Sequence, residues 1–507
     1  MARLQCTVFL SLALLAASAC AQDVWPFGGS RRAGGRELDL WNLGLLGVKA
    51  CEPGKMPASG ESTGARRITP AKSAGADNGP RALEVVLLHP ESPAAKAGLV
   101  VGDVVRGVQG ASFEEGALAP LAAALDKAER AEKGLVILQV RRMVKGREES
   151  VSLKVPVRGS AKGSFEHKAV QRTALAFLAQ RQAGDGGFAE TLSGKNGAVV
   201  QTALAGLAWL AASEDPKRGS WAESINGARG FILRHALTPD EAPRIRNGAN
   251  WDQSTWGLAH GLIFLSELRQ RSRTSVPTGE LERLARVLQE RMEASGGYAH
   301  GPGGKNALDY LELNILSAAV LSALGVAHAA GAEVDLVRAR KVLDYCEASA
   351  SGDGGVGYST GAGQKGQGNI GRTAAALLGA RTLGFAETPF ALRMKSYVER
   401  NAADVLGGHA SLMQHVLFSG VAAAALGAEP LKRWWERAER DLILARTPDG
   451  SLQPRPWHES LSMGSNSDVS VGEVWSTACW AVVLGADAKR SLGPGFPGWC
   501  GISAAQR

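Results

Sequence analysis

The chain of 507 residues is 45% hydrophobic, 21% charged and only 6% aromatic. This length exceeds that of one ordinary domain, so two or three domains with a sizeable core are expected. The net charge of +8 is spread along the chain without a long basic block. That distribution argues against a nucleic-acid-binding protein, because such proteins concentrate basic residues on one face.

The first residues have the pattern of a secretory signal. A basic start at Arg3 precedes an apolar stretch over residues 4–17, and small residues follow it. The stretch is too short to span a membrane, so we predict a signal peptide over residues 1–21 and an exported protein, periplasmic or secreted. Cleavage after Ala21 would release the protein, whereas cleavage before Cys20 would leave a lipid-anchored cysteine as the one membrane attachment. Both interpretations remain open.

A small α+β domain is predicted after a Gly- and Arg-rich linker over residues 22–37. It covers residues 38–158 and includes a long loop over residues 52–80 that is poor in large apolar side chains. Runs of β-branched and aliphatic residues indicate strands, and one stretch has the periodicity of a helix. The strands cover residues 82–89, 134–142 and 151–158, and the helix covers residues 117–130.

Three motifs in this domain resemble those of PDZ domains. They are Ser-Pro-Ala-Ala-Lys-Ala-Gly-Leu (92–99), Gly-Asp-Val-Val (102–105) and Val-Gln-Gly (108–110). In that family a peptide adds a strand to a sheet edge, and backbone N–H groups of an early loop bind its terminal carboxylate. The resemblance implies that a peptide C-terminus or a partner protein binds at the matching loop, Leu43, Gly44, Leu45, Leu46 and Gly47. The alternative is that the domain only supports the one that follows.

Beyond residue 159, two kinds of helix alternate. Amphipathic helices alternate with helices that are apolar on nearly all faces and are therefore expected to be buried. The buried helices begin near Ala198, Trp251, Asp309, Ile370, Ser411 and Val471, and a Gly-rich corner precedes all but the second. Units that cannot bury their faces alone must stack. We predict six hairpins of about twelve helices closed into an (α/α)6 toroid over residues 164–488, with a tail over residues 489–507.

The corner Gln-Ala-Gly-Asp-Gly-Gly-Phe (182–188) resembles the corner repeats of terpene cyclases and prenyltransferase β subunits. The resemblance implies an inner barrel of buried helices within an outer ring. The plan of signal, PDZ-like domain and toroid also resembles a family of exported bacterial proteins. The Asp-x-Asp-Asp acid motif of squalene cyclases is absent. Where prenyltransferases have an Asp-x-Cys zinc pair, this chain has Asn369-Ile370-Gly371, so no metal and no cofactor are predicted.

The amino-terminal ends of the buried helices should meet at one mouth of the toroid, which is the expected site. Candidate catalytic residues there are Asp309, Glu312, His415 and Glu473. Candidate ligand-binding residues are Asp252, His300, Arg372 and His409, with Asp468 as a further polar group. Asp309 and Glu312 form either a carboxylate pair suited to glycoside hydrolysis or a helix cap. His409 and His415 either bind a metal with Asp309 or make hydrogen bonds in the mouth.

Two functions follow from these features. In the first, an exported protein binds peptides through its PDZ-like module and has a binding or scaffolding role, while the toroid takes a small molecule or glycan in a cavity of unassigned chemistry. In the alternative, the toroid mouth is the site of a carbohydrate-active lyase or hydrolase, or of a cyclase-like enzyme. The fold alone does not decide between them.

Overall fold

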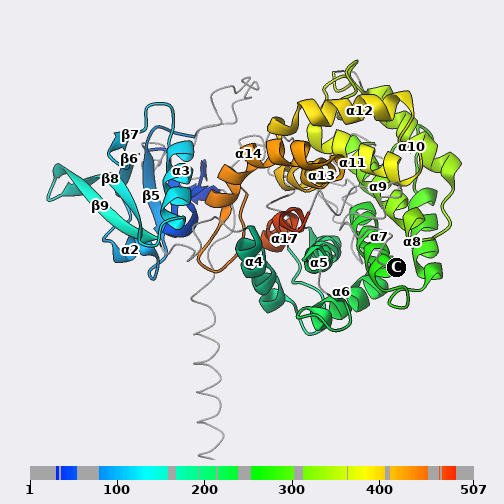
Figure 1. The fold of residues 1–507 in the computed structure, drawn as a ribbon, viewed down its shortest axis with the longest axis horizontal. Helices are drawn as coiled ribbons and strands as arrows, with labels where there is room; N and C mark the ends of the chain where they lie inside the picture. Colours follow the sequence, from blue (N-terminus) through cyan, green and yellow to red (C-terminus); the bar gives the residue numbers. More distant parts are fainter. Residues whose placement is uncertain are drawn as a thin grey trace, which may run out of the picture.

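The computed structural model has two parts, a small β-sheet domain and a ring of helices (Figure 1). It describes residues 30–33, 36–53, 79–157, 167–191, 193–212, 215–237, 253–301, 312–361, 363–405, 411–454, 468 and 471–486. The predicted combination of a small sheet domain with a helical toroid is therefore confirmed. The finer resemblances to PDZ domains and to terpene cyclases stay predictions.

One antiparallel sheet forms the centre of the small domain. Its strands are β3 (Trp41–Asn42), β4 (Val48–Cys51), β5 (Leu83–Leu88), β6 (Val104–Val108), β7 (Ala111–Ser112), β8 (Gly134–Val144) and β9 (Arg147–Val157). They pair in the order β3-β4-β5-β6-β8-β9, and β7 pairs with β6. The connections include the 3-10 helix η1 (Gly44–Leu46), α2 (Pro93–Lys96) and α3 (Leu118–Glu129). A separate hairpin joins β1 (Ser30–Ala33) to β2 (Arg36–Asp39).

The alternation of residues along β8 gives the sheet one buried and one more exposed face. Val136, Leu138 and Val140 are buried in the domain core. Gln139 and Arg141 alternate with Leu138 and Val140 along the strand and point to the other face, because successive strand residues alternate. The more exposed face of β8 and its neighbour β9 is therefore directed away from the core.

The described helices of the second part form six hairpins. The inner helices are α5 (Gly194–Ala211), α7 (Ser254–Arg271), α9 (Asn314–Ala329), α11 (Ile370–Thr382), α13 (Leu412–Leu426) and α17 (Glu473–Leu484). The outer helices are α4 (His167–Arg181), α6 (Ala222–His235), α8 (Thr278–Glu290), α10 (Leu336–Ser349), α12 (Pro389–Arg400), followed by η3 (Ala402–Asp404), and α14 (Ala428–Ala445). Each inner helix contacts the next, and α17 contacts α5, so the ring closes (Figure 1).

Burial follows the two sequence patterns. Every residue from Asn314 to Ala327 of inner helix α9 is buried, whereas outer helix α8 buries only one face. Small residues let the inner helices approach closely: a Cβ atom on Gly379 of α11 would collide with the backbone of Leu321 in α9. Among the described helices, none reaches the combination of length and hydropathy that a membrane span requires.

The glycine corners share one backbone turn. Their glycines have φ of +88° at Gly186, +93° at Gly296, +98° at Gly354 and +90° at Gly450, the left-handed region that glycine adopts without strain. In each corner the glycine N–H donates to the carbonyl three residues earlier, and that earlier residue donates its own N–H to the carbonyl four residues later. The sequence repeats because the same turn is needed at each of these four passages from an outer helix to an inner one.

The same glycines set the spacing between hairpins. A Cβ atom on Gly186 would collide with the Gly227 carbonyl of α6, and one on Gly296 would collide with Lys341 of α10. Gly450, in the last described corner, packs in the same way on Thr173 of α4. Since α4 belongs to the first hairpin, the corner that ends the ring packs on the helix that begins it.

Hydroxyl groups on the inner helices hold these corners. The N–H of Tyr298 donates to Ser317 Oγ at 2.9 Å, and the N–H of Leu452 donates to Thr477 Oγ1 at 3.0 Å. The N–H of Val356 donates in the same way to a threonine of α11. Buried serine and threonine on otherwise apolar helices are thereby satisfied, as buried polar groups generally are.

Helix α14 joins the two parts of the molecule. Its residues Ile443 and Leu444 belong to the hydrophobic core of the sheet domain. Arg446 forms a buried bidentate ion pair with Glu129 at the end of α3, with N–O distances of 2.6 and 2.7 Å. Asn42 Nδ2 donates to the carbonyl oxygens of Leu444 and Arg446. The shared core and the buried polar contacts make one unit of the two parts.

Candidate functional site

The loop matched to the PDZ carboxylate site lies at the contact with the helical ring. Gly44 has φ of +60°, and a Cβ atom there would lie 2.5 Å from the carbonyl oxygen of Ile443 in α14. Gly47 packs on Pro448, and Leu43 and Leu46 are buried. The N–H groups of Leu43, Leu46 and Gly47 already donate to carbonyls within the loop or in β4. In this structure the loop contacts α14, and three of its N–H groups are used internally.

The first turns of the inner helices meet at one end of the ring, as the hairpin pattern predicts. Gly257 of α7 packs on Asn196 and Val199 of α5. Gln414 of α13 donates from Nε2 to the carbonyl of Ile315 at the start of α9, at 3.0 Å. The residues that gather there are called the mouth cluster: Trp256, His260, His300, Ser411, Asp468 and Trp475.

Histidine and tryptophan side chains form one half of the mouth cluster. Trp256 Nε1 donates to His300 Nδ1 at 2.7 Å. The His260 ring lies against Trp256, with 6.2 Å between ring centroids, and meets Trp475 edge-on at 5.7 Å. Burial lowers the pKa of both histidines to about 4, so both rings are neutral at pH 7.

His260 presents an unusual acceptor. Its side chain is fully buried, and its Nδ1 lies 2.9 Å from the carbonyl oxygen of Trp256. Because a carbonyl only accepts, Nδ1 carries the proton of the neutral ring and Nε2 carries the lone pair. Within the described residues, Nε2 has no hydrogen-bond partner. This nitrogen is therefore a buried acceptor for which the described part of the chain supplies no donor.

Asp468 forms the other half of the mouth cluster and acts as an anchor. Its Oδ1 accepts from Ser411 Oγ at 2.6 Å and from Trp475 Nε1 at 2.8 Å, and its Oδ2 accepts from the N–H of Met413 at 3.2 Å. Burial raises the pKa of this carboxyl, and the hydrogen bonds from Ser411 and Trp475 oppose that shift. The carboxyl ties α17 to the first turn of α13 and fixes the Trp475 ring.

Two predicted residues lie beside each other at the starts of α11 and α13. Arg372 is 5% exposed and donates to the carbonyl oxygens of Val356 at 3.2 Å and Gln367 at 2.9 Å. Burial lowers its pKa to about 10, and no described carboxylate forms an ion pair with it. His415 is buried against Gly371, where a Cβ atom would collide with its ring. Both side chains thus pack within the ring.

Glu473, predicted as catalytic, lies in a second group, the junction cluster: Lys49, Arg181, Asp449 and Glu473. Arg181 Nη2 lies 3.5 Å from Asp449 Oδ2 and 3.6 Å from Glu473 Oε1. Burial lowers the pKa of Lys49, on β4, to about 8, against the opposing influence of the Glu473 and Asp449 carboxylates. The sheet domain therefore contributes a buried amine to the first turn of an inner helix.

The two carboxyl groups of the junction cluster have unlike surroundings. Asp449 Oδ1 accepts from Thr447 Oγ1 at 2.5 Å and from the N–H of Ser451 at 3.1 Å. Asp449 Oδ2 and Glu473 Oε2 are both buried without a hydrogen-bond partner among the described residues, so Asp449 differs in the bonds that its Oδ1 accepts. Burial raises the pKa of Glu473, the Asp449 carboxylate raises it further, and Arg181 and Lys49 lower it. A carboxyl with a raised pKa beside a hydrogen-bonded carboxylate is suited to acid chemistry.

The remaining predicted residues fall into two groups. Glu312 accepts from Ser295 Oγ at 2.7 Å and precedes the start of α9, where Leu313 is the N-cap, so it holds a corner and does not cap the helix. Asp252, Asp309 and His409 lie outside the described residues. Among the residues that the structure describes, no three His, Cys, Asp or Glu side chains come together as metal ligands would.

Comparison with known proteins gives a family and several distant structures. None of the curated proteins matches the sequence significantly. An inactive variant of an alpha-1,6-mannanase from Salegentibacter sp. HEL1_6, solved with alpha-1,6-mannotriose, is 10% identical, with 64% of this chain and 99% of that chain covered and a TM-score of 0.44. A family 76 glycoside hydrolase from a bovine Bacteroides thetaiotaomicron strain is also 10% identical, covers 70% of this chain and 84% of its own, and has a TM-score of 0.38.

The sequence match covers the ring. Residues 168–485, from α4 to the end of α17, match a family described as a domain of unknown function, DUF6288. The match takes in the mouth cluster and, apart from Lys49, the junction cluster. Because it spans more than half of the chain, the protein belongs to the DUF6288 family.

Proposed function

We propose that the protein is carbohydrate-active and that the mouth cluster binds a neutral sugar chain. The observation that supports this most directly is the His260 ring, which contacts Trp256 and Trp475 and whose Nε2 is a buried acceptor with no donor among the described residues. A sugar offers hydroxyl donors along its edge and an apolar face of C–H groups that can pack on an indole ring. A buried acceptor left without a partner costs about 1–3 kcal/mol, so a ligand hydroxyl that donates to Nε2 gains that energy.

Access to His260 requires a movement of Trp256. The His260 side chain is fully buried, whereas Trp256, which packs against it, is partly exposed. A sugar that reaches Nε2 must displace the indole and break its hydrogen bond to His300. Binding should therefore change tryptophan fluorescence, and a Trp256→Phe variant should lose most of that change.

Glu473 is the best-supported proton donor of the four catalytic candidates. Asp309 lies outside the described residues, Glu312 is engaged with Ser295, and His415 is packed against Gly371. In the hydrolytic form of the proposal, Glu473 gives its proton to the glycosidic oxygen as the bond to the anomeric carbon breaks. A water molecule adds to that carbon and passes its proton to Asp449.

The positions of the two clusters on α17 suggest the length of the substrate. Glu473 and Trp475 are two residues apart, which is roughly 200° around a helix, and they face the junction and mouth clusters respectively. A helix is about 10 Å across with its side chains, so a monosaccharide cannot touch both clusters. We therefore expect the substrate to be an oligosaccharide that lies over the first turn of α17.

A binding titration tests the sugar-binding proposal. Neutral oligosaccharides of three or more units are titrated calorimetrically into the protein and into His260→Phe, which keeps an aromatic ring but removes the acceptor. We expect at least one oligosaccharide to bind, and the variant to bind it about ten-fold or more weakly. His328→Phe, an exposed histidine on the last turn of α9, is the matched control and should bind normally. Equal binding by the protein and His260→Phe would remove the support for this site.

For the sheet domain, we propose support of the ring as the primary role. The proposal rests on the shared core at Ile443 and Leu444 and on the buried Arg446–Glu129 pair. Peptide binding at residues 43–47 would have to displace α14 from η1, which a peptide array with the whole protein can test. Export through the signal-like residues 1–21 remains part of the proposal, and a fusion to a periplasmic reporter enzyme tests it.

A further inference from the structure

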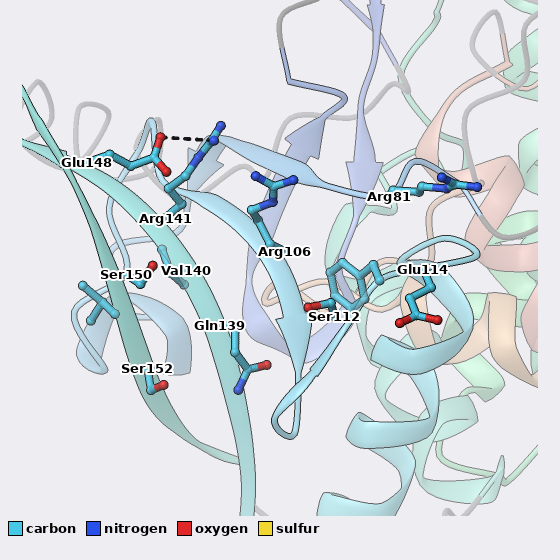
Figure 2. Close-up of a pocket in the computed structure, with 12 residues that line it drawn as sticks. Arg81, Arg106, Ser112, Glu114, Gln139, Val140, Arg141, Glu148, Ser150 and Ser152 are labelled. Carbon is cyan, nitrogen blue, oxygen red and sulfur yellow. Dashed lines mark ion pairs between the residues drawn. The ribbon is translucent and has the colours of Figure 1, made fainter.

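A hollow of about 610 Å³ lies on the more exposed face of the sheet. Its walls come from β6, β7, β8 and β9, and from residues that precede β5 and α3. The residues that line it include three arginines, three serines and two glutamates: Arg81, Arg106, Arg141, Ser112, Ser150, Ser152, Glu114 and Glu148 (Figure 2). None of them belongs to η1 or to the contact with α14, so this hollow is distinct from the loop at residues 43–47 and from both clusters of the ring.

An irregularity in β6 places Arg106 in the hollow. The pairing of β6 with β8 shifts in register between Val105 and Gly107, so Arg106 is the extra residue of a bulge. Gly107 beside it has no room for a side chain, because a Cβ atom would collide with the Ala111 carbonyl. Figure 2 shows Arg106 and Arg141 on neighbouring strands, with Glu148 paired to Arg141. The bulge thus adds the guanidinium of Arg106, on β6, to that of Arg141, on the paired strand β8.

Positive charge in the hollow exceeds negative charge by one, because three arginines and two glutamates, Glu114 and Glu148, line it. Arg141 is paired with Glu148 at 3.1 Å, a contact exposed enough to be weak. Arg81 and Arg106 form no ion pair with any described carboxylate, and the hydroxyls of the three lining serines make no hydrogen bond to described residues. Each guanidinium carries five N–H donors in a planar fork and no acceptor. Two of the three guanidinium groups in the hollow, those of Arg81 and Arg106, are therefore left without a carboxylate partner among the described residues.

We propose that this hollow is a binding site for a small anionic ligand that carries carboxylate or phosphate groups. Oxyanions accept hydrogen bonds from guanidinium N–H groups, and their geometry matches the planar fork of Arg106 and its neighbour Arg141. The volume is that of sites for small molecules of metabolite size and exceeds what one phosphate ion fills. The serine hydroxyls of β7 and β9 donate to the remaining oxygens. The proposal is independent of the sugar-binding function of the ring.

The test titrates the whole protein with inorganic phosphate and, separately, with citrate, at constant ionic strength maintained with sodium chloride. We expect saturable binding of at least one anion by calorimetry, weakened about ten-fold or more in Arg106→Ala. Arg147→Ala is the matched control, because Arg147 is an exposed arginine of β9 that does not line the hollow. It should bind within about two-fold of the unmodified protein, since distant exposed charges are screened.

The outcomes separate the ligand chemistries and the role of the site. Binding of phosphate alone identifies a phosphorylated ligand, and binding of citrate alone identifies a polycarboxylate. Arg81→Ala provides a second variant if Arg106→Ala lowers the melting temperature. Failure of both anions to bind, or equal weakening in Arg147→Ala, would overturn the proposal and leave the arginines as ordinary surface charge.

Discussion

The mouth and junction clusters flank the first turn of the same helix, yet their chemistry is opposite. The mouth side of α17 has neutral imidazoles, indole rings and an aspartate that is wholly engaged as an acceptor. The junction side has two cations and two carboxyls, and burial raises the pKa of one of these carboxyls, Glu473. One helix start therefore separates a surface suited to recognising a neutral ligand from one suited to moving protons. The sheet domain contributes only to the second.

The largest expected effect concerns the junction carboxyl. Glu473→Gln should lower the turnover of a cleavable oligosaccharide by roughly 10²–10⁴-fold, because the amide cannot donate a proton as a carboxylic acid does. Binding of the same sugar should change little, since Trp475 and His260 lie on the other side of α17. Turnover is measured by released reducing ends and binding by calorimetry. A parallel loss of both would mean that the two clusters are one site.

The second effect concerns the attachment of the sheet domain. Glu129→Ala leaves Arg446 buried without its partner and should lower the free energy of unfolding by about 3–5 kcal/mol. The double variant Glu129→Leu with Arg446→Met should recover most of that loss, because buried pairs are often replaceable by apolar residues. Urea denaturation followed by circular dichroism gives both values. An unchanged unfolding free energy in Glu129→Ala would show that the contact at α14 does not depend on this pair.

The third effect separates the two acidic residues by role. Asp468→Asn should lower the free energy of unfolding by about 2 kcal/mol, because the amide cannot accept from Ser411, Trp475 and Met413 as the carboxylate does. Its turnover, corrected for the folded fraction, should remain within a few-fold of normal. The matched comparison is Glu473→Gln, with turnover lost and stability retained. If Asp468→Asn lost turnover and Glu473→Gln lost only stability, the mouth cluster would be the catalytic one and the junction cluster the structural one.

The last expected effect is a pH dependence of stability. His260 and His300 have folded-state pKa values of about 4, below the unfolded value, so the unfolded state binds more protons between about pH 6.5 and 4. Stability should therefore fall as the pH drops through this window, by at most about 1.4 kcal/mol per pH unit for each histidine. Glu473 acts in the opposite sense, because its raised pKa makes the folded state bind the proton first. His260→Phe should flatten the fall, and an unchanged slope would show that this histidine is not buried neutral.

The sequence predicts those features that local pattern determines. The turn at Gly186 and the buried face of α9 follow from residues close together in the chain, so the hairpins and the ring could be predicted. Contacts between distant residues could not be predicted. Gly44 and Ile443 are far apart in sequence but in contact in the structure. This contact places α14 against residues 43–47, the loop predicted to bind a peptide. The same packing of the sheet domain on α14 brings Lys49 into the junction cluster.

Part of the mouth cluster was missed for a different reason. The prediction considered charged and imidazole groups at helix starts, and so included His300 and Asp468 but not Trp256 or Trp475. His260 follows the start of α7 by nearly two turns and sits in an apolar run, where a histidine gives no signal of its own. A search for tryptophans within the first turn of each buried helix would have found both indoles.

The packing of Gly450 on Thr173 has a consequence for how the ring folds. An open repeat array grows one unit at a time and needs polar terminal caps, but here the final unit serves as the cap of the first. Deleting any hairpin would expose the apolar faces of both neighbouring hairpins, whereas removing the last unit of an open array exposes only one such face. The closing contact also joins residues nearly 280 positions apart, and such distant pairings slow folding. We expect the ring to fold in one late, all-or-none step, and a circular permutant opened between two hairpins to keep the same architecture.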